Sequence, residues 1–304
     1  LQRFVMSDYN IKILIRAEKG VSAQERFRQA FENTGVDVDT LSSHSGKVEV
    51  FEGDITNANL GLSANVFNEL KNSVDEVFHC AAAVKFSEIN RAVLYSTNCK
   101  GAQNILDFCI SGRKKHLHHV STAYVAGRKK GFVYENNLDD SNGFHNPYEE
   151  TKFLAEKKIH AYSINHGLTF TIYRPSIIIG NSRTGYTKNF DNIYFYAKNL
   201  SFLKRRLVSN VHENEPDLNG LNETKIEKPT MIPLRIPANP DATINLVPID
   251  YVVNAIMSIS LDRNRINSTF HIVNPYPPTL SFILESINEA ISVTGPSIVD
   301  YNEF

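Results

Sequence analysis

Glu76-Val77-Phe78-His79-Cys80-Ala81-Ala82 is apolar almost throughout, and this stretch decides the fold. A strand covered on both faces reads as a nearly continuous apolar run, whereas a strand with one face in water alternates between apolar and polar residues. Such doubly covered strands are typical of parallel sheets flanked by helices. The stretch therefore predicts a buried strand in a parallel sheet.

Short β-branched runs alternate with helical patterns on both sides of this strand. Strands that alternate with helices of this length indicate βαβ units. The predicted strands are 11–16, 48–54, 76–82, 116–125 and 169–179, and the predicted helices are 23–33, 64–71, 91–111 and 148–165. The fold class that follows is α/β, with a doubly wound parallel sheet.

The pattern loosens after Gly185. A helix is predicted at 189–206, and residues 211–240 are polar, punctuated by Pro and without clear periodicity. Regularity returns with a strand at 244–250, a helix at 251–261, a strand at 269–273 and a helix at 281–294. We expect a nucleotide-binding domain formed by 1–185, to which 244–275 returns, and a smaller substrate-binding lobe formed by 186–243 and 276–304.

The bulk composition excludes several classes of function. The chain has 304 residues, 42% of them hydrophobic, with 32 basic and 33 acidic residues and a net charge of −1, so no basic stripe argues for nucleic acid. No apolar run approaches the ~20 residues of a membrane span. Cys80, Cys99 and Cys109 lack metal-type spacing, and we interpret them as reduced core residues of a cytoplasmic protein that binds no metal.

The chemistry is predicted from Tyr148 and Lys152, in Asn146-Pro147-Tyr148-Glu149-Glu150-Thr151-Lys152. Residues four apart on a helix project from one face, and a neighbouring ammonium lowers the pKa of a phenol. A hydroxyl from the strand that ends at Ser121 and Thr122 would then hold a carbonyl against the phenol. This set of groups suits acid–base work in carbonyl or alcohol redox chemistry.

A second Tyr-x-x-x-Lys pair occurs at Tyr194 and Lys198, so the spacing alone is weak evidence. Tyr148 stands at the start of a helix between two predicted strands, whereas Tyr194 has no such frame. We interpret Tyr194 as ordinary packing. His79, His118 and His119 lie on buried-looking strands and are interpreted as core histidines. The aromatic segment 190–207 is interpreted as core packing, with an acyl tunnel or a membrane-contacting surface as alternatives.

Ligands of doubly wound sheets bind beyond the carboxyl ends of the strands. Each of the five predicted strands of the first domain carries chemically informative residues at or near its carboxyl end. They are Arg16, Asp54, the small run Ala81, Ala82 and Ala83, the hydroxyls Ser121 and Thr122, and Arg174-Pro175-Ser176.

With these residues in place, the chain clearly resembles the extended short-chain dehydrogenase/reductases, and within them the fatty-acyl reductase (male-sterility-like) and thioester-reductase branch. The phrases that carry the resemblance are Gly53-Asp54-Ile55-Thr56 with Leu60-Gly61-Leu62-Ser63, His79-Cys80-Ala81-Ala82, Thr97-Asn98-Cys99-Lys100-Gly101, His119-Val120-Ser121-Thr122-Ala123-Tyr124-Val125-Ala126-Gly127 and Asn245-Leu246-Val247-Pro248-Ile249-Asp250-Tyr251.

The resemblance implies a role for each matching residue. Thr122 matches the hydroxyl that orients the carbonyl, with Ser121 as the fallback, and Tyr148 matches the proton donor. Lys152 matches the residue that binds the nicotinamide ribose and lowers the pKa of the Tyr. The resemblance also implies Asp54 at the adenine amine, Ile55 against the ring, Asn98 below the site and Pro175 beside the nicotinamide. From their places at strand ends we expect Ala81 to Ala83 and Lys85 along the cofactor, with a surface lysine as the alternative for Lys85, and Ser176 beside the nicotinamide.

Arg16 favours NADP over NAD as the cofactor. NAD-specific members place an acid at this strand end, whereas Arg accepts a 2′-phosphate. Arg26 adds a second charge. The Thr-Gly-x-x-Gly-x-x-Gly turn of the family does not precede the strand 11–16, so we expect a sequence that lacks its beginning.

The function that follows is an NADPH-dependent reduction of an acyl thioester, carried on coenzyme A or a carrier protein, to an aldehyde or alcohol. The alternatives are an epimerase, dehydratase or ketone reductase acting on a nucleotide sugar or sterol-like alcohol, and a catalytically silent dinucleotide sensor or scaffold. The resemblance also implies a homodimer through the helices at 91–111 and 148–165.

Overall fold

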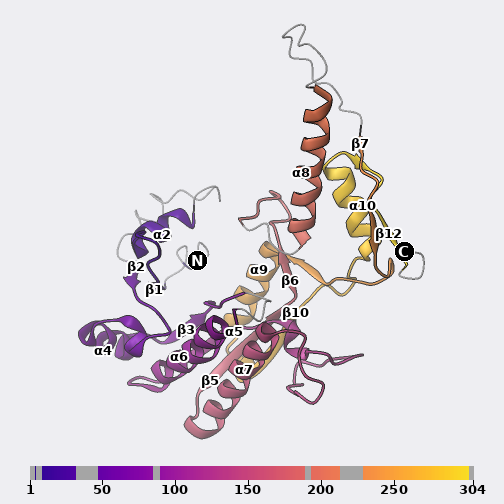
Figure 1. Ribbon diagram of the computed structural model, residues 1–304. Coiled ribbons are helices and arrows are strands. Elements are labelled where there is room, and N and C mark those ends of the chain that lie inside the picture. The colour runs from indigo at the N-terminus through magenta and orange to yellow at the C-terminus, as the bar shows by residue number, and fades with distance from the viewer. Residues whose placement is uncertain are drawn as a thin grey trace. The chain divides into compact units, whose positions relative to one another are not determined.

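The apolar stretch that begins at Glu76 forms strand β3 (Glu76–His79) at one end of a parallel sheet. The strand order in this four-stranded sheet is β10-β5-β4-β3, with β4 at His116–Val120, β5 at Thr169–Pro175 and β10 at Ser268–Ile272. Every neighbouring pair runs parallel. Figure 1 shows the computed structural model, which describes residues 4, 9–31, 47–84, 90–188, 193–212 and 229–300.

A second parallel sheet is formed by β1 (Ile11–Ile15) and β2 (Val48–Glu52), with Ile11 opposite Val48. Helix α2 (Ala23–Gln29) follows β1 in the sequence and is capped by the Ser22 hydroxyl, which accepts a hydrogen bond from Glu25 N–H at 3.2 Å. The alternation of strand and helix confirms the predicted α/β fold of the doubly wound, parallel type.

The chain divides into two compact units, Leu1–Ser176 with Val252–Ile272 and Ile177–Tyr251 with Val273–Phe304. The first unit ends at Ser176, before the predicted boundary at 185, because the predicted strand 169–179 splits there. Ser176 N–H donates to Ile272 O, whereas Ile177 N–H donates to Asn245 O. Residues 177–179 form β6 (Ile177–Ile179), which pairs with β9 (Leu246–Pro248) in the second unit.

The predicted strand 76–82 and the predicted helix 23–33 end earlier than expected, at His79 and Gln29, and two other predicted elements of the first unit differ in kind. The predicted strand 116–125 ends at Val120 and continues as a 3-10 turn, η4 (Ala123–Ala126), because the Thr122 hydroxyl caps that turn. The predicted helix 91–111 is divided into α5 (Arg91–Leu94), the π-helical η3 (Tyr95–Lys100) and α6 (Gly101–Ile110). Single π-helical turns occur frequently at functional sites.

The remaining elements of the first unit are the turn η1 (Ala58–Gly61) and helices α4 (Ala64–Ser73) and α7 (Pro147–His166), with η5 at Arg263–Arg265. Helix α9 (Ile249–Ser260) crosses the boundary between the units. Helices α6 and α7 lie side by side against the sheet (Figure 1).

The second unit contains α8 (Ile193–His212), α10 (Leu280–Ala290) and short strand pairs that the periodicity did not reveal. The pairs are β7 (Thr230–Met231) with β11 (Val293–Thr294), and β8 (Arg235–Pro237) with β12 (Ser297–Val299). Strands of two or three residues carry too few positions for an alternating pattern. A small apolar cluster of Leu200, Ile232 and Val293 holds α8 to this part of the unit.

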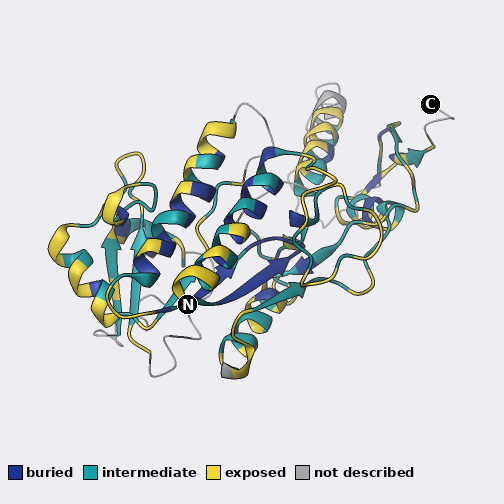
Figure 2. Ribbon diagram, turned by 90° about the horizontal axis from the view of Figure 1, so that it is seen from below, coloured by how far each residue is buried: buried dark blue, intermediate teal, exposed yellow. Residues whose placement is uncertain are grey.

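The main core lies where α4, α6 and α7 meet strands β4 and β5 in the first unit. Its most buried members include Leu106, Cys109, Leu117, Ile159 and Ile172. Figure 2 shows buried residues along the central strands and on the inward sides of the covering helices, with exposed residues on the outward sides. Burial on both faces was predicted from the apolar strands. Strands β4 and β5 show it, whereas β3, at the end of the sheet, is mostly half-buried.

Within the described part of the chain, no helix combines the length and the apolar character that crossing a membrane requires.

Candidate active site

Helix α7 begins one residue before Tyr148, and local signals explain this start. The Asn146 side chain accepts a hydrogen bond from Glu149 N–H at 3.0 Å, and Pro147 occupies the first helical position. Both residues are typical helix starts. The helix ends where Gly167 adopts a left-handed conformation with φ of 64°. Tyr148 and Lys152 are thereby set one turn apart, as predicted.

The end of β4 supplies the hydroxyl partner. Ser121 N–H donates to Tyr173 O at 2.7 Å, which holds the end of β4 against β5. Thr122 is buried, its hydroxyl lies 3.5 Å from Pro175 O, and it shares a hydrogen bond with the Tyr148 side chain. The structure therefore brings together the two side chains that were predicted to hold a carbonyl oxygen.

The pKa of Tyr148 is raised above its ordinary value of 10.0, which corrects the predicted lowering. Burial is the largest cause and disfavours the phenolate, while the Thr122 hydroxyl acts in the opposite direction and Glu149 adds to the rise. The Lys152 ammonium donates instead to Val120 O at 2.7 Å. Tyr148 consequently stands at neutral pH as a phenol, the form that donates a proton.

Lys152 is buried, with 3% of its surface exposed. Burial lowers its pKa from 10.5 to about 8, an effect that Glu156 partly opposes. Besides Val120 O, its Nζ lies 3.4 Å from His119 Nε2. The side chain is therefore an ammonium at neutral pH, held against the end of β4.

Asn98, on the π-helical turn η3, holds the loop after β3. Its Oδ1 accepts from Ala83 N–H at 2.8 Å, and its Nδ2 donates to Ala83 O at 3.1 Å and to the Thr151 hydroxyl at 3.1 Å. The buried Asn98 amide thus links the loop that contains Ala83 to Thr151 of α7, the residue before Lys152. Within this structure Asn98 orders the site through these contacts.

Asp54 and Arg16 face each other across the ends of β2 and β1, with Arg16 Nη1 3.8 Å from Asp54 Oδ2. The turn is shaped by Gly53, where a Cβ would lie 2.5 Å from Leu60 O, and by Gly61, whose φ is +72°. Burial raises the pKa of Asp54, but hydrogen bonds from Thr56 and the charge of Arg16 outweigh it and leave that pKa below its ordinary value.

Other predicted cofactor residues are placed less directly. Arg26 is engaged by Glu18 at 3.3 Å and by the carbonyl of Arg16, so its charge is already compensated. Ile55 lies against Gly101 of α6, where an added Cβ would approach its Cδ1 to 2.6 Å. Ala81 is exposed and Ala82 half-buried after the end of β3, whereas Lys85 lies outside the described residues.

Ser121, Pro175 and Ser176 are buried around the same strand ends. The hydroxyl oxygens of Ser121 and Ser176 have no hydrogen-bond partner among the described residues. Buried hydroxyls are ordinarily satisfied, so an unsatisfied pair at a strand end marks a place for a polar ligand. Ser176 was predicted to lie beside the nicotinamide, and Ser121 was predicted as the alternative to Thr122 for orienting the carbonyl.

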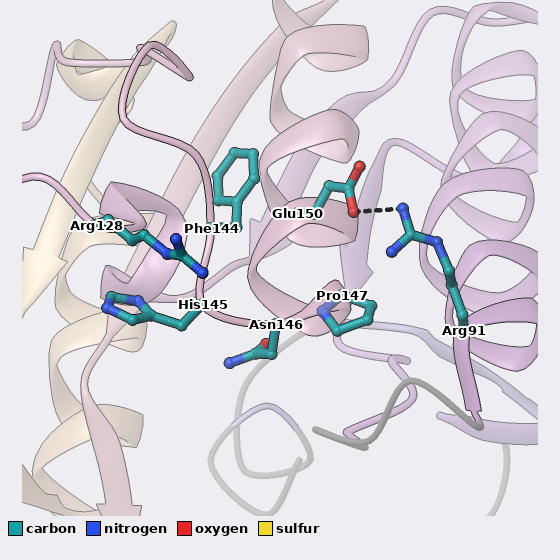
Figure 3. Close-up of a pocket in the computed structure, with 7 residues that line it drawn as sticks. All are labelled: Arg91, Arg128, Phe144, His145, Asn146, Pro147 and Glu150. Carbon is teal, nitrogen blue, oxygen red and sulfur yellow. Dashed lines mark hydrogen bonds and ion pairs between the residues drawn. The ribbon is translucent and has the colours of Figure 1, made fainter.

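A cavity of about 310 Å³ opens at the N-terminal end of α7. Its lining residues are Arg91, Arg128, Phe144, His145, Asn146, Pro147 and Glu150. Figure 3 shows Arg128 and His145 on one side of this helix end and Arg91 on the other, where its guanidinium meets Glu150 at 2.9 Å. The cavity adjoins the first turn of α7 that carries Tyr148, and it was not predicted from the sequence.

Sequence reasoning also missed a buried ion pair between Arg174 and Glu156. Glu156 lies four residues beyond Lys152 on α7, a spacing that suggests a pair with Lys152 and gives no signal for the contact with Arg174 of β5. His118 and His119 are buried as predicted, and His118 Nδ1 binds the Tyr173 hydroxyl at 2.9 Å. The contact of His119 with Lys152 was not anticipated. Cys99 and Cys109 are buried as expected, whereas Cys80 is exposed because β3 ends at His79.

Tyr194 and Lys198 lie on α8 in the second unit. The Tyr194 hydroxyl accepts a hydrogen bond from Gly180 N–H at 2.8 Å, a structural contact that agrees with the predicted packing role. No group of three or more His, Cys, Asp or Glu side chains in the described ranges is arranged to hold a metal ion.

Comparison with known proteins agrees with this geometry. The family model described as male sterility protein matches residues 3–256. The aldehyde reductase lnbA of Aspergillus flavus is 24% identical over 288 residues, which cover 90% of this chain and 25% of that protein. The probable fatty acyl-CoA reductase 4 of Arabidopsis thaliana is 26% identical over 292 residues, covering 81% of this chain and 56% of that protein.

Two solved structures are similar over nearly the whole chain. The terminal R domain from the myxalamid PKS-NRPS pathway has a TM-score of 0.74 and 26% identity, covering 99% of this chain and 68% of that one. A thiolation-reductase di-domain from an archaeal non-ribosomal peptide synthetase has a TM-score of 0.73 at 21% identity, covering 100% of this chain and 58% of that one, which shows the fold.

The chain spans only 25% of the length of the aldehyde reductase and 56% of that of the fatty acyl-CoA reductase. The family match nevertheless covers most of the chain, including every residue of the Thr122, Tyr148 and Lys152 site. The chain belongs to the male sterility protein family, and its fold is that of the extended short-chain dehydrogenase/reductases.

Proposed function

We propose that the chain reduces an acyl thioester, carried on coenzyme A or on a carrier protein, with NADPH as the reductant. The observation that carries the proposal is the hydrogen bond between Thr122 and Tyr148 beside the buried Lys152. The names of the relatives support the substrate class, since they include a fatty acyl-CoA reductase and reductase domains of peptide synthetases.

The described residues fit a nicotinamide dinucleotide at several points. Lys152 and Tyr148 would hold the nicotinamide ribose, with the unsatisfied hydroxyls of Ser121 and Ser176 nearby. Arg16, whose side chain is 55% exposed, would take the 2′-phosphate that distinguishes NADP from NAD. The domain roles predicted from the sequence belong to this proposal, with the first unit binding the dinucleotide and the second contributing to substrate binding.

The cofactor, when bound, supplies a hydride to the carbonyl carbon of the thioester. The electron pair of the C=O π bond then moves to oxygen, where the Thr122 hydroxyl and the Tyr148 phenol donate hydrogen bonds. Stabilising a developing oxyanion is commonly a large term in catalysis. Because its raised pKa keeps Tyr148 protonated, the phenol is ready to transfer its proton to this oxygen and form a thiohemiacetal.

Collapse of the thiohemiacetal re-forms the C=O bond and breaks the C–S bond. The sulfur leaves with a proton as a free thiol, and the product is an aldehyde. The Thr122 hydroxyl favours the phenolate that remains on Tyr148 after the transfer, since a hydrogen bond to the charged form stabilises it. No nucleophilic cysteine is required. A second hydride transfer to the aldehyde would give the alcohol at the same two donors.

The experiment records the consumption of NADPH and the release of thiol in the same reaction. Protein containing this chain is mixed with NADPH and a panel of long-chain acyl-CoA and acyl-carrier-protein substrates, and NADPH consumption and free thiol are recorded together. One NADPH per thiol is expected for an aldehyde product and two for an alcohol, and both signals should fall by at least ~100-fold with Tyr148→Phe. Turnover of ketones, alcohols or nucleotide sugars without thiol release from any thioester would overturn the proposal.

A further inference from the structure

We propose that His119 is a positioning residue for the active-site ammonium: its neutral imidazole accepts a hydrogen bond from Lys152 and holds Nζ at the end of β4. The inference rests on the function proposed above, in which Lys152 would hold the nicotinamide ribose. The resemblance to the family assigned no role to this side chain, which was interpreted from the sequence as a core histidine.

The contact joins two buried side chains that lie far apart in the sequence. Lys152 Nζ is 3.4 Å from His119 Nε2 and 2.7 Å from Val120 O. His119 is 1% exposed and Lys152 is 3% exposed, so little water reaches either group. An ammonium has three N–H donors. His119 and Val120, which are adjacent on β4, accept hydrogen bonds from two of these donors. The third N–H is left to bind the ligand.

His119 is neutral because burial, together with the charges of Lys152 and His79, keeps its pKa well below the ordinary 6.5. A neutral imidazole has one donor nitrogen and one acceptor nitrogen. Since Nε2 faces the ammonium, Nε2 is the acceptor and the proton resides on Nδ1. Nδ1 has no hydrogen-bond partner among the described residues. A buried donor without a partner is unfavourable, so the ring orientation is better explained by Lys152 than by packing.

The other titratable groups around Lys152 do not replace this acceptor. They are Glu156 on α7, Cys99 on η3, Cys80 after β3 and His79 on β3. Burial raises the pKa of Cys99 to about 11 and lowers the pKa of His79 to about 3, and the pKa of Cys80 also lies above its ordinary value. These three groups are therefore neutral near pH 8.

Glu156 is the one charged group of this set, and its carboxylate is engaged by Arg174. Among the described residues, Val120 O and His119 Nε2 are the atoms within hydrogen-bonding distance of Nζ. Removal of the His119 acceptor would leave a buried N–H of the ammonium without a partner. The protonated form would be disfavoured, and the pKa of Lys152 would fall.

The test measures the titration of Lys152 directly, by NMR of protein with isotope-labelled lysine and with the signal assigned through Lys152→Arg. His119→Gln carries an amide oxygen that can replace Nε2 as acceptor. His119→Asn is equally polar but too short to reach Nζ, and His119→Met is similar in length to Gln without the oxygen. We expect the Asn and Met variants to lower the pKa of Lys152 by about one unit, a ten-fold change in its protonation constant, and the Gln variant to retain the wild-type titration.

His118→Gln is the matched control, since His118 is equally buried on β4 but binds the Tyr173 hydroxyl. It should destabilise the fold without moving the titration of Lys152. The positioning role is wrong if His119→Asn leaves the titration of Lys152 unchanged. It is also wrong if His119→Gln shifts that titration as far as His119→Asn does. Both outcomes can be read even when His119→Met fails to fold. The titration needs no substrate, so absence of thioester reduction would overturn the proposed function while leaving this result readable.

Discussion

The Arg174 guanidinium donates to both carboxylate oxygens of Glu156, from Nε at 3.1 Å and from Nη2 at 2.6 Å. The two side chains are 1% and 0% exposed. Arg174 also donates to the carbonyls of Glu135 and Asn137, in the long connection between η4 and α7. One ion pair thereby joins β5 to α7 and fixes the chain that leads from Thr122 to Tyr148.

Arg174→Met should destabilise the protein by about 3–5 kcal/mol, because removal of one partner leaves a buried charge uncompensated. The double variant Arg174→Met with Glu156→Gln should recover much of this loss, since neither partner then carries a charge. The free energy of unfolding in urea, measured for both variants and for Glu156→Gln alone, gives the coupling between the two sites. Additive losses would show that the pair does not act as a unit.

Tyr148→Phe should lower turnover by at least ~100-fold, the scale expected for loss of a general acid. Phenylalanine keeps the ring in place and removes only the proton donor that binds Thr122. Tyr194→Phe is the control, because the Tyr194 hydroxyl binds the backbone of Gly180 in the second unit. Initial rates are compared at equal concentrations of folded protein. A Tyr148→Phe enzyme with near-normal rates would mean that another group protonates the oxyanion.

Lys152 should make stability depend on pH between about 8 and 10.5. Its pKa is about 8 in the folded protein and 10.5 ordinarily, so in this window the unfolded chain binds more protons and stability rises with pH. Below pH 8 the burial penalty is present in full, at about 3 kcal/mol from roughly 1.4 kcal/mol per pKa unit.

Lys152→Met should therefore be more stable than the wild type at pH 7, although inactive, and this advantage should shrink as pH rises towards 10.5. Urea unfolding of both proteins across this range measures the difference, in which the titration of tyrosines and cysteines cancels. Lys157→Met, on the exposed face of the same helix, is the control. A stability difference that does not change with pH would show that the Lys152 proton is unaffected by folding.

Much of the site was predictable because its signals are local. The Asn146 cap, Pro147 and the left-handed Gly167 define α7 within a short stretch of sequence, and the helix period then sets Tyr148 against Lys152. The small and hydroxyl residues that end β3 and β4 were equally visible. These features depend on neighbours in sequence, which propensity and spacing describe well.

The features that could not be predicted depend on contacts between distant residues. Residues 169–179 read as one continuous strand, so nothing local reveals that the chain changes pairing partners at Ser176. The raised pKa of Tyr148 follows from its burial and not from its spacing to Lys152. The contact of His119 with Lys152 joins β4 to α7 and likewise requires the tertiary structure.

Arg16→Ala should weaken the binding of NADPH about ten- to a hundred-fold, because a charge-assisted contact contributes roughly 1.5–3 kcal/mol. NADH lacks the 2′-phosphate, so its affinity should change little. Arg16 is suited to this task because its side chain is 55% exposed and its pairing with Asp54 spans 3.8 Å, a distance that leaves the guanidinium available for a closer anion. Titrations of both cofactors by nicotinamide fluorescence give the two affinities.

Arg28→Ala is the matched control for this change. Arg28 lies on α2, its side chain is 62% exposed, and it pairs with Glu25 within its own helix. Its removal should leave both affinities unchanged. Salt provides a second check, since the loss in Arg16→Ala should diminish as ionic strength screens the contact. Equal losses for NADPH and NADH in Arg16→Ala would mean that this guanidinium supports the turn at Asp54 and does not read the 2′-phosphate.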